Sequence, residues 1–286
     1  MEAAYKLLRI SPLFLLLAMA VSVTPVSAQK KQVSTGVGLY ARDGTYPDVM
    51  YDAPGNTNPD ANEEKCFPWN LPDARATTVS VTRLKIPPAA RAEYEKACDA
   101  FNKDKFKEAE QHSRAASDKF QDYSAGWVML GVILEAQHKA QEALDACSHA
   151  ATIDAAYLPA YLCSAEISVR NRQWEQVLHF SDLALGLQSA GDPYACYYRA
   201  TAYLHLNNLI EAKKSALEAL AIDVYSHEPR LFLLLAEIYE REGDNADAIA
   251  QLHQFLKHPT DRHQEEAAKQ FLAKLESPRA SVATTH

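Results

Sequence analysis

The second part of the sequence repeats about every 34 residues, and this period constrains the fold more than any other feature. Five units can be aligned, and their successive starts lie 34, 34, 35 and 36 residues apart, at Ala90, Ser124, Leu158, Pro193 and Pro229. A period of this length is typical of helix pairs that stack on one another and bury a continuous core between neighbours. We therefore expect residues 90–262 to form an all-α solenoid of five helix-turn-helix units.

Small side chains recur at three positions within each unit. Twelve of the fifteen residues at positions 8, 20 and 27 are alanine. Two helices can approach closely only where the side chains between them are small, so these positions are expected at the helix contacts. In order of position they are Ala97, Gly131, Ala165, Ala200 and Ala236, then Ala109, Ala143, Val177, Ala212 and Ala248, then Ala116, Ala150, Ala184, Ala219 and Phe255.

The second unit carries the pattern Trp127-x-x-Leu130-Gly131, followed by Ala143. With these residues the chain resembles the tetratricopeptide repeat family. The resemblance covers residues 90–262 and implies two antiparallel helices in each unit. It is weakest in the first unit, where Glu93 and Lys96 stand at positions that are usually bulky.

A further amphipathic segment follows the fifth unit. Residues 263–276 place Ala267, Phe271 and Leu275 on one side of a helix and charged residues on the other. A solenoid needs such a helix to cover its last apolar face, so we expect a capping helix here. Residues 277–286 are expected to be a disordered tail.

The N-terminus has the pattern of a secretory signal peptide. Lys6 and Arg9 precede an apolar run at residues 13–21, and a small-x-small site ends at Ala28. The run is too short to span a bilayer, so we expect cleavage after Ala28 and no stable membrane insertion afterwards. The sequence therefore predicts a periplasmic or secreted protein.

Residues 29–89 differ in composition from the repeats. They hold seven of the 14 prolines and four of the 9 glycines, which favour turns over regular elements. We expect a mostly irregular segment, with one strand at residues 77–86 that Pro87 and Pro88 end.

All five cysteines lie after the predicted cleavage site, in a compartment that permits disulfides. Because the number is odd, at least one thiol stays unpaired unless it pairs between chains. Cys66 lies in the irregular segment, and its preferred partner is Cys98 in the first helix. Cys147, Cys163 and Cys196 fall on helices, where the reading as small buried apolar residues remains open beside pairing.

Composition and motifs exclude several classes of function. The formal net charge is −8, which disfavours binding to nucleic acid because a binder needs cationic residues opposite the phosphates. The ten histidines show no metal-ligand spacing, and no nucleophile or phosphate-loop motif occurs. We therefore expect no metal, no cofactor and no enzymatic activity.

The resemblance implies that the first helix of each unit lines a concave groove, with positions 2, 5, 9, 12 and 13 facing inward. Some of these side chains alternatively pack against residues 29–89 or face water. The residues expected to form a partner-binding groove are Val128, Val132, Leu162, Glu166, Arg170, Tyr194, Tyr197, Thr201, His205, Leu233, Glu237 and Arg241.

Two functions remain from different classes. The favoured one is an exported adaptor or scaffold that binds a partner protein or peptide in the groove. The alternative is a structural element of a cell-envelope assembly, which self-associates through the strand at 77–86 or through the free thiol.

Overall fold

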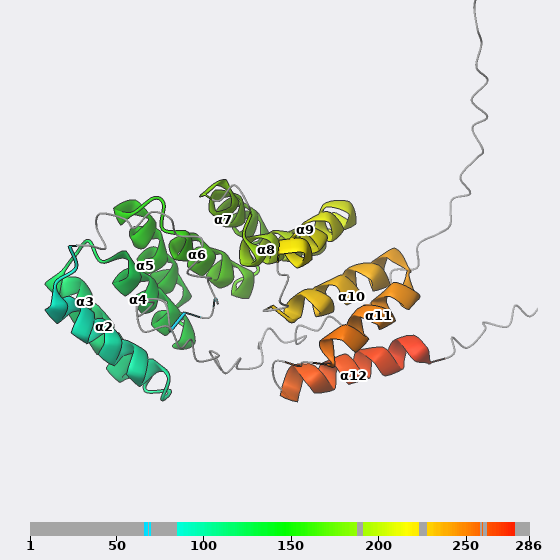
Figure 1. The fold of residues 1–286 in the computed structure, drawn as a ribbon, viewed down its shortest axis with the longest axis horizontal. Coiled ribbons are helices and arrows are strands. Elements are labelled where there is room, and N and C mark those ends of the chain that lie inside the picture. The colour runs from blue at the N-terminus through cyan, green and yellow to red at the C-terminus, as the bar shows by residue number, and fades with distance from the viewer. Residues whose placement is uncertain are drawn as a thin grey trace, which may run out of the picture. The chain divides into compact units, whose positions relative to one another are not determined.

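The computed structural model describes residues 66, 67, 69, 85–187, 191–222, 228–257, 259 and 262–277. The signal peptide, the tail from residue 278 and residues 77–84 of the expected strand lie outside the described residues. Within the described part, eleven helices follow one another along the chain (Figure 1). None of these helices combines the length and the apolar character needed to cross a bilayer. They are α2 (Pro88–Phe101), α3 (Phe106–Lys119), α4 (Ser124–Ala136), α5 (Ala140–Ile153), α6 (Leu158–Arg170), α7 (Trp174–Leu187), α8 (Pro193–His205), α9 (Leu209–Ile222), α10 (Arg230–Glu242), α11 (Asn245–Phe255) and α12 (Arg262–Glu276).

The helices form the five pairs that the period predicts. We call α2, α4, α6, α8 and α10 the A helices, and α3, α5, α7, α9 and α11 the B helices. Each A helix packs against its own B helix, against the preceding B helix and against the neighbouring A helices. The result is an α-solenoid in which every unit contacts only its neighbours, and α12 follows as the capping helix.

The small-residue positions lie where the helices meet. Every residue other than glycine at positions 8, 20 and 27 has an exposed fraction of 0%. The one large residue among them, Phe255, packs with Ala268 and Phe271 of the capping helix. A bulky side chain is accommodated there because the element that follows α11 is the capping helix rather than another repeat.

The A helices begin at residues suited to a helix N-terminus. Pro88, Pro159 and Pro193 occupy the first turns of α2, α6 and α8, where the missing N–H leaves no hydrogen bond unmade. The carboxylate of Asp192 caps α8 by accepting a hydrogen bond from the Ala195 N–H at 2.8 Å. Pro229 lies one residue before α10 begins rather than inside its first turn.

The turns between the A and B helices share one backbone conformation. Position 15 of every unit has a positive φ, at Asp104, His138, Arg172, Asn207 and Gly243. The next residue donates its N–H to the carbonyl five residues earlier, as from Lys105 to Ala100 at 3.0 Å and from Asp244 to Tyr239 at 2.9 Å. This hydrogen bond closes the helix C-terminus in a Schellman motif. Only the fifth turn uses glycine, although the other four adopt the same left-handed conformation.

The capping helix closes the end of the array. Leu233, Ala236 and Leu252 form a cluster with Phe255, and Ala268 and Phe271 of α12 complete it. Of the residues expected on its apolar side, Phe271 is buried, whereas Ala267 and Leu275 are partly exposed. The wholly buried alanine is Ala268. Because Ala267 and Ala268 are adjacent, the sequence does not show which of them faces α11. In the structure Ala268 packs against α11.

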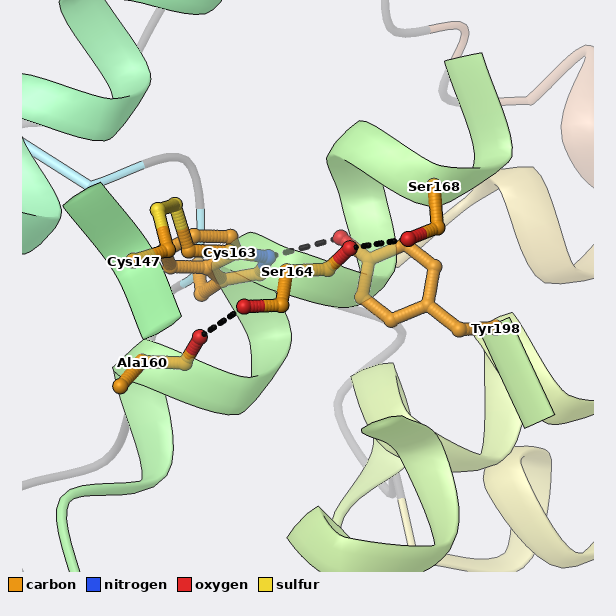
Figure 2. The surroundings of a disulfide bond; sticks show 7 residues. Cys147, Ala160, Cys163, Ser164, Ser168 and Tyr198 are labelled. Atoms are coloured by element: carbon orange, nitrogen blue, oxygen red, sulfur yellow. Dashed lines mark hydrogen bonds between the residues drawn. A yellow bond between two sulfur atoms is a disulfide. The ribbon is translucent and has the colours of Figure 1, made fainter. Parts of the chain in front are cut away.

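A second disulfide joins the second unit to the third. Cys147 of α5 is bonded to Cys163 of α6 (Figure 2), so of the two interpretations that the sequence leaves open, pairing applies to these two buried residues. The disulfide lies against Gly131 of α4, where a Cβ atom would be 2.2 Å from the Cys147 Sγ. Glycine replaces the alanine found at position 8 of the other units because the disulfide occupies the space of a methyl group.

We predict opposite effects of the same substitution at two helical glycines. Gly131→Ala should lower the free energy of unfolding by about 1–3 kcal/mol, because the new methyl group overlaps the Cys147 sulfur. Gly186→Ala in α7 should raise it by about 0.5–1 kcal/mol, because nothing lies within 4 Å of a Cβ there and alanine favours the helix. Urea unfolding followed by circular dichroism measures both.

Overlap of the new methyl group with the disulfide, as the cause of the cost of Gly131→Ala, is tested by removing the disulfide. In a Cys147→Ala/Cys163→Ala chain, Gly131→Ala should lose most of its cost. An equal cost in both backgrounds would contradict overlap with the disulfide as its origin.

Candidate functional site

The predicted groove residues lie on the A helices, but most of their side chains are buried. Val128, Leu162 and Thr201 have an exposed fraction of 0%, and Tyr194 is 3% exposed. Leu233 belongs to the cluster that the capping helix closes. These side chains therefore present little surface to a partner in the described structure, and their place in a partner-binding groove stays a prediction. Val132 and Tyr197 are also buried, whereas Glu166, Arg170, His205 and Arg241 remain partly exposed.

Three residues of the N-terminal segment contact the A helices, on the side that we call the concave face because the family resemblance implies a groove there. Cys66 is joined by a disulfide to Cys98 of α2, which is the pair that the sequence favours. The indole N–H of Trp69 donates a hydrogen bond to the hydroxyl of Tyr198 of α8 at 2.7 Å. Cys66, Phe67 and Trp69 are 5%, 3% and 2% exposed, so the solenoid buries all three. Part of the chain itself thus occupies the surface on which a partner was expected.

Two ion pairs recur at equivalent places on the concave face. In α6 the Arg170 Nε lies 3.1 Å from the Glu166 Oε1. In α10 the Arg241 Nη2 lies 2.6 Å from the Glu237 Oε1. Both pairs join positions 9 and 13 of their units, which are one helical turn apart and face the same side.

A third carboxylate extends the α6 pair toward α4. The Glu135 Oε1 lies 3.7 Å from the Arg170 Nε. Among the described residues, the other oxygen of Glu135, Oε2, is buried and has no hydrogen-bond partner. Burial raises the pKa of Glu135 above its ordinary value, although Arg170 opposes this shift. The site therefore holds a carboxylate oxygen with spare capacity to accept a hydrogen bond.

Burial and neighbouring charges act in opposite directions on the other two carboxylates. Burial would raise the pKa of Glu166, but the charges of Arg170 and Arg230 lower it below its ordinary value. The pKa of Glu237 is raised by burial despite the adjacent Arg241. Glu166 is therefore the more strongly held anion of the two, because two guanidinium groups stabilise its charge.

Arg230 is fixed at the start of α10. Its Nε and Nη2 donate to the two carboxylate oxygens of Glu228 at 2.7 and 2.6 Å. Its guanidinium carbon also lies 4.8 Å from the centre of the Tyr197 ring, a cation–π arrangement. Arg241 links α10 to α8 through a 2.8 Å hydrogen bond from its Nη1 to the Leu204 carbonyl. The face therefore presents charged groups whose positions are set by neighbouring helices.

His205 occupies position 13 of the fourth unit, where α6 and α10 have arginine. Its ring stacks on the Trp174 ring with 4.0 Å between centroids and 9° between planes. Burial lowers its pKa to about 4, and the charges of Arg241 and Arg172 act in the same direction. His205 is therefore a neutral aromatic group at neutral pH rather than a charged ligand.

The sequence did not single out Trp69 or Tyr198 as a pair. They are 129 residues apart, and no local spacing connects them. One available signal was that Phe67 and Trp69 are large aromatic residues in a segment rich in proline and glycine. Aromatic residues of this kind are commonly buried, so the segment had to contact the repeats.

The arrangement is suited to recognition. Among the described residues, no three histidine, cysteine or acidic side chains come together as a metal site. Rigidly held carboxylates, guanidinium groups and aromatic rings can instead bind the main chain and side chains of another segment.

Comparisons with solved structures identify the architecture. A thermophilic TPR protein from Thermus thermophilus, TTC0263, matches with a TM-score of 0.55 and 18% identity, over 65% of this chain and 98% of that one. The fold is that of tetratricopeptide repeat proteins. A repeat protein of this fold from Parabacteroides merdae ATCC 43184 matches with a TM-score of 0.52 and 21% identity, over 66% of this chain and 74% of that one.

A chain from a hetero-tetrameric complex also matches this structure. The APC/C hetero-tetramer Cut9–Hcn1 matches with a TM-score of 0.59 and 15% identity, over 67% of this chain and 37% of that one. No protein-family model and no curated protein matches the sequence. At identities this low, the likeness shows that this chain shares the fold, and it gives no information about the partners of this chain.

We predict that His205 makes the fold sensitive to mild acid. Its folded pKa of about 4 lies below the ordinary value of 6.5, so the unfolded chain binds the proton more readily as the pH falls from 7 to 5. Protonation then favours unfolding, and His205 should account for about 1–2 kcal/mol of lost stability over this range. His205→Gln should show a correspondingly smaller loss in urea unfolding at the two pH values.

His149 provides the matched control, because its ring also contacts a tryptophan, Trp127, at 4.4 Å but is exposed. His149→Gln should keep the pH dependence of the wild-type chain. If His205→Gln and His149→Gln behave alike, burial of His205 is not the cause.

We also predict that Cys196 is the single cysteine open to alkylation in the non-reduced chain, and only after unfolding. It is 2% exposed, and burial raises its pKa to about 11, so little thiolate forms at pH 8. Iodoacetamide should label no cysteine in the native chain and Cys196 alone in urea, as read by peptide mass spectrometry. A label on Cys147 or Cys163 without reductant would contradict their disulfide.

Proposed function

We propose that this chain is an exported scaffold that binds a partner protein or peptide through the concave face of its A helices. The observation that carries this proposal is the row of charged side chains that neighbouring helices hold in place on that face. Arg170, Arg230 and Arg241 are each paired with a carboxylate, so they need little reordering to meet a partner. Groups arranged before binding lose less conformational entropy on association.

The chemistry of the partner follows from the charge of the face and of the chain. Loss of residues 1–28 would remove Lys6, Arg9 and Glu2 and change the formal net charge from −8 to −9. The Glu135 Oε2 is a buried acceptor without a donor in the described structure. A neutral or cationic protein segment therefore fits this face better than an anionic lipid or a nucleic acid.

Export to the periplasm or the exterior is supported by two independent features. The N-terminal pattern is that of a signal peptide with cleavage after Ala28. The described residues also contain two disulfides, Cys66–Cys98 and Cys147–Cys163, and such bonds persist in oxidising compartments.

Self-association is the second candidate, and one observation favours it. Leu183 and Leu187 of α7, Leu206 after α8, and Ile210 and Leu217 of α9 are exposed large apolar side chains. The free thiol, Cys196, is buried, which disfavours self-association through an intermolecular disulfide. Sedimentation of the purified chain at tens of micromolar distinguishes a monomeric scaffold from a self-assembling one.

We predict that two charges of the fifth unit contribute to partner binding. Arg230→Gln with Arg241→Gln keeps hydrogen-bond donors near Glu228 and Glu237 but removes both charges, and should weaken binding at least tenfold. The wild-type and altered chains serve as baits in an extract of the source organism. Affinities for the protein retained by the wild-type bait are then compared.

The matched control is Lys214→Gln with Lys269→Gln, which changes the net charge equally at side chains that are 63% and 54% exposed. This control should bind as the wild-type chain does. Urea unfolding of all three chains separates lost binding from lost folding. Equal binding by both double variants would mean that the partner does not bind at the concave face of the fifth unit.

A further inference from the structure

Trp69 is held on the concave face in the manner of a bound ligand. The residues described from the segment around it, Cys66, Phe67 and Trp69, lie within four consecutive positions of the sequence. The rings of Phe67 and Trp69 lie 5.9 Å apart, and both are buried. One disulfide to α2 and one hydrogen bond to α8 attach this short segment to two A helices.

Tyr198 gives this contact its chemical specificity. Its side chain points from α8 toward α6, which carries Ser164 and Ser168 (Figure 2). Burial raises the pKa of Tyr198 well above its ordinary value, so the hydroxyl keeps its proton. This hydroxyl accepts the indole N–H of Trp69 at 2.7 Å, and the Glu166 carboxylate lies near enough to raise its pKa further. The oxygen of a protonated tyrosine can accept a hydrogen bond, so a side chain with an N–H donor suits this position.

A fixed anion, Glu166, lies near the Tyr198 hydroxyl. Glu166 is held by the Arg170 Nε at 3.1 Å, and Arg230 also lowers its pKa. A buried acceptor that loses its donor costs free energy, so the Tyr198 oxygen favours an aromatic residue with an N–H over one without. We call Tyr198, Glu166 and Arg170 the indole subsite.

Trp69 packs in the apolar core of the solenoid but belongs to none of its repeat units. The helix pairs meet at the small residues of positions 8, 20 and 27, which are wholly buried between helices. The Cys66–Cys98 disulfide instead keeps Trp69 close to the indole subsite, which raises its effective concentration there. A free segment that presents an indole can therefore compete with the tethered Trp69 for the same contacts.

We propose that the indole subsite binds a tryptophan in an extended segment of the partner protein, and that Trp69 occupies the subsite in its absence. This proposal rests on the proposed function and specifies the partner, as a neutral or cationic segment that presents an indole. The incoming tryptophan displaces Trp69 and donates its N–H to Tyr198 in the same way.

The test uses the full chain and a labelled peptide with the sequence of residues 65–72, in which serine replaces cysteine; its single charged side chain is a lysine. Fluorescence anisotropy measures its affinity for the wild-type and Trp69→Ala chains. The Trp69→Ala chain should bind the peptide at least tenfold more tightly, because the tethered competitor is gone. A peptide with phenylalanine in place of tryptophan should bind about tenfold more weakly than the original.

Two substitutions on α8 separate the subsite from general effects on folding. Trp69→Ala/Tyr198→Phe should lose most of the gained affinity, because the hydroxyl is missing. Trp69→Ala/Tyr203→Phe removes a hydroxyl from a partly exposed tyrosine of the same helix and should retain it. Circular dichroism and urea unfolding confirm that each chain is folded.

Several outcomes would overturn the proposal. Equal affinity of the wild-type and Trp69→Ala chains, or failure of Trp69→Ala to fold, would make Trp69 a fixed part of the core. A wild-type dimer in sedimentation that Trp69→Ala dissociates would identify the occupant as a second copy of this chain. None of these results affects the test on Arg230 and Arg241, so the proposed function stands or falls separately.

Discussion

Close approach of neighbouring helices is the constraint on which the rest of this structure depends. Alanine at positions such as Ala97, Ala143 and Ala184 lets the helices of a pair, and of adjacent pairs, pack without a gap. Gly131 shows how tight this limit is, because the Cys147–Cys163 disulfide leaves no room for one methyl group beside it. The same spacing in each unit brings the A helices together on one side and so creates the concave face.

That packing also determines the electrostatics of the concave face. Where A helices touch, the apolar side chains between them are buried. The charged groups at positions 9 and 13 are then largely or partly shielded from solvent as well. Glu166 keeps its charge there because Arg170 and Arg230 offset the cost of burial. His205 stays neutral instead, because it is buried and lies near the cations of Arg241 and Arg172. In the proposed function, recognition by this face therefore depends on a few fixed groups rather than on a broad apolar surface.

The predictions from sequence succeeded where the signal was local or periodic. Five helix pairs and a capping helix follow from a 34-residue period, and their first residues lie close to the aligned unit starts. The pattern was less informative about exposure, because groove positions such as Val128 and Leu162 are wholly buried. Periodicity shows which side of a helix a residue takes, but it does not show what covers that side.

The sequence by itself determined the helix pairs, their number and their close contacts, because each depends on residues within one period of about 34. Only the tertiary structure decided that Cys147 bonds to Cys163 and that Trp69 lies on Tyr198. These contacts join different units or segments, and their distances depend on how each helix pair rotates on the next. That rotation is the sum of many side-chain contacts, and no single spacing in the sequence records it.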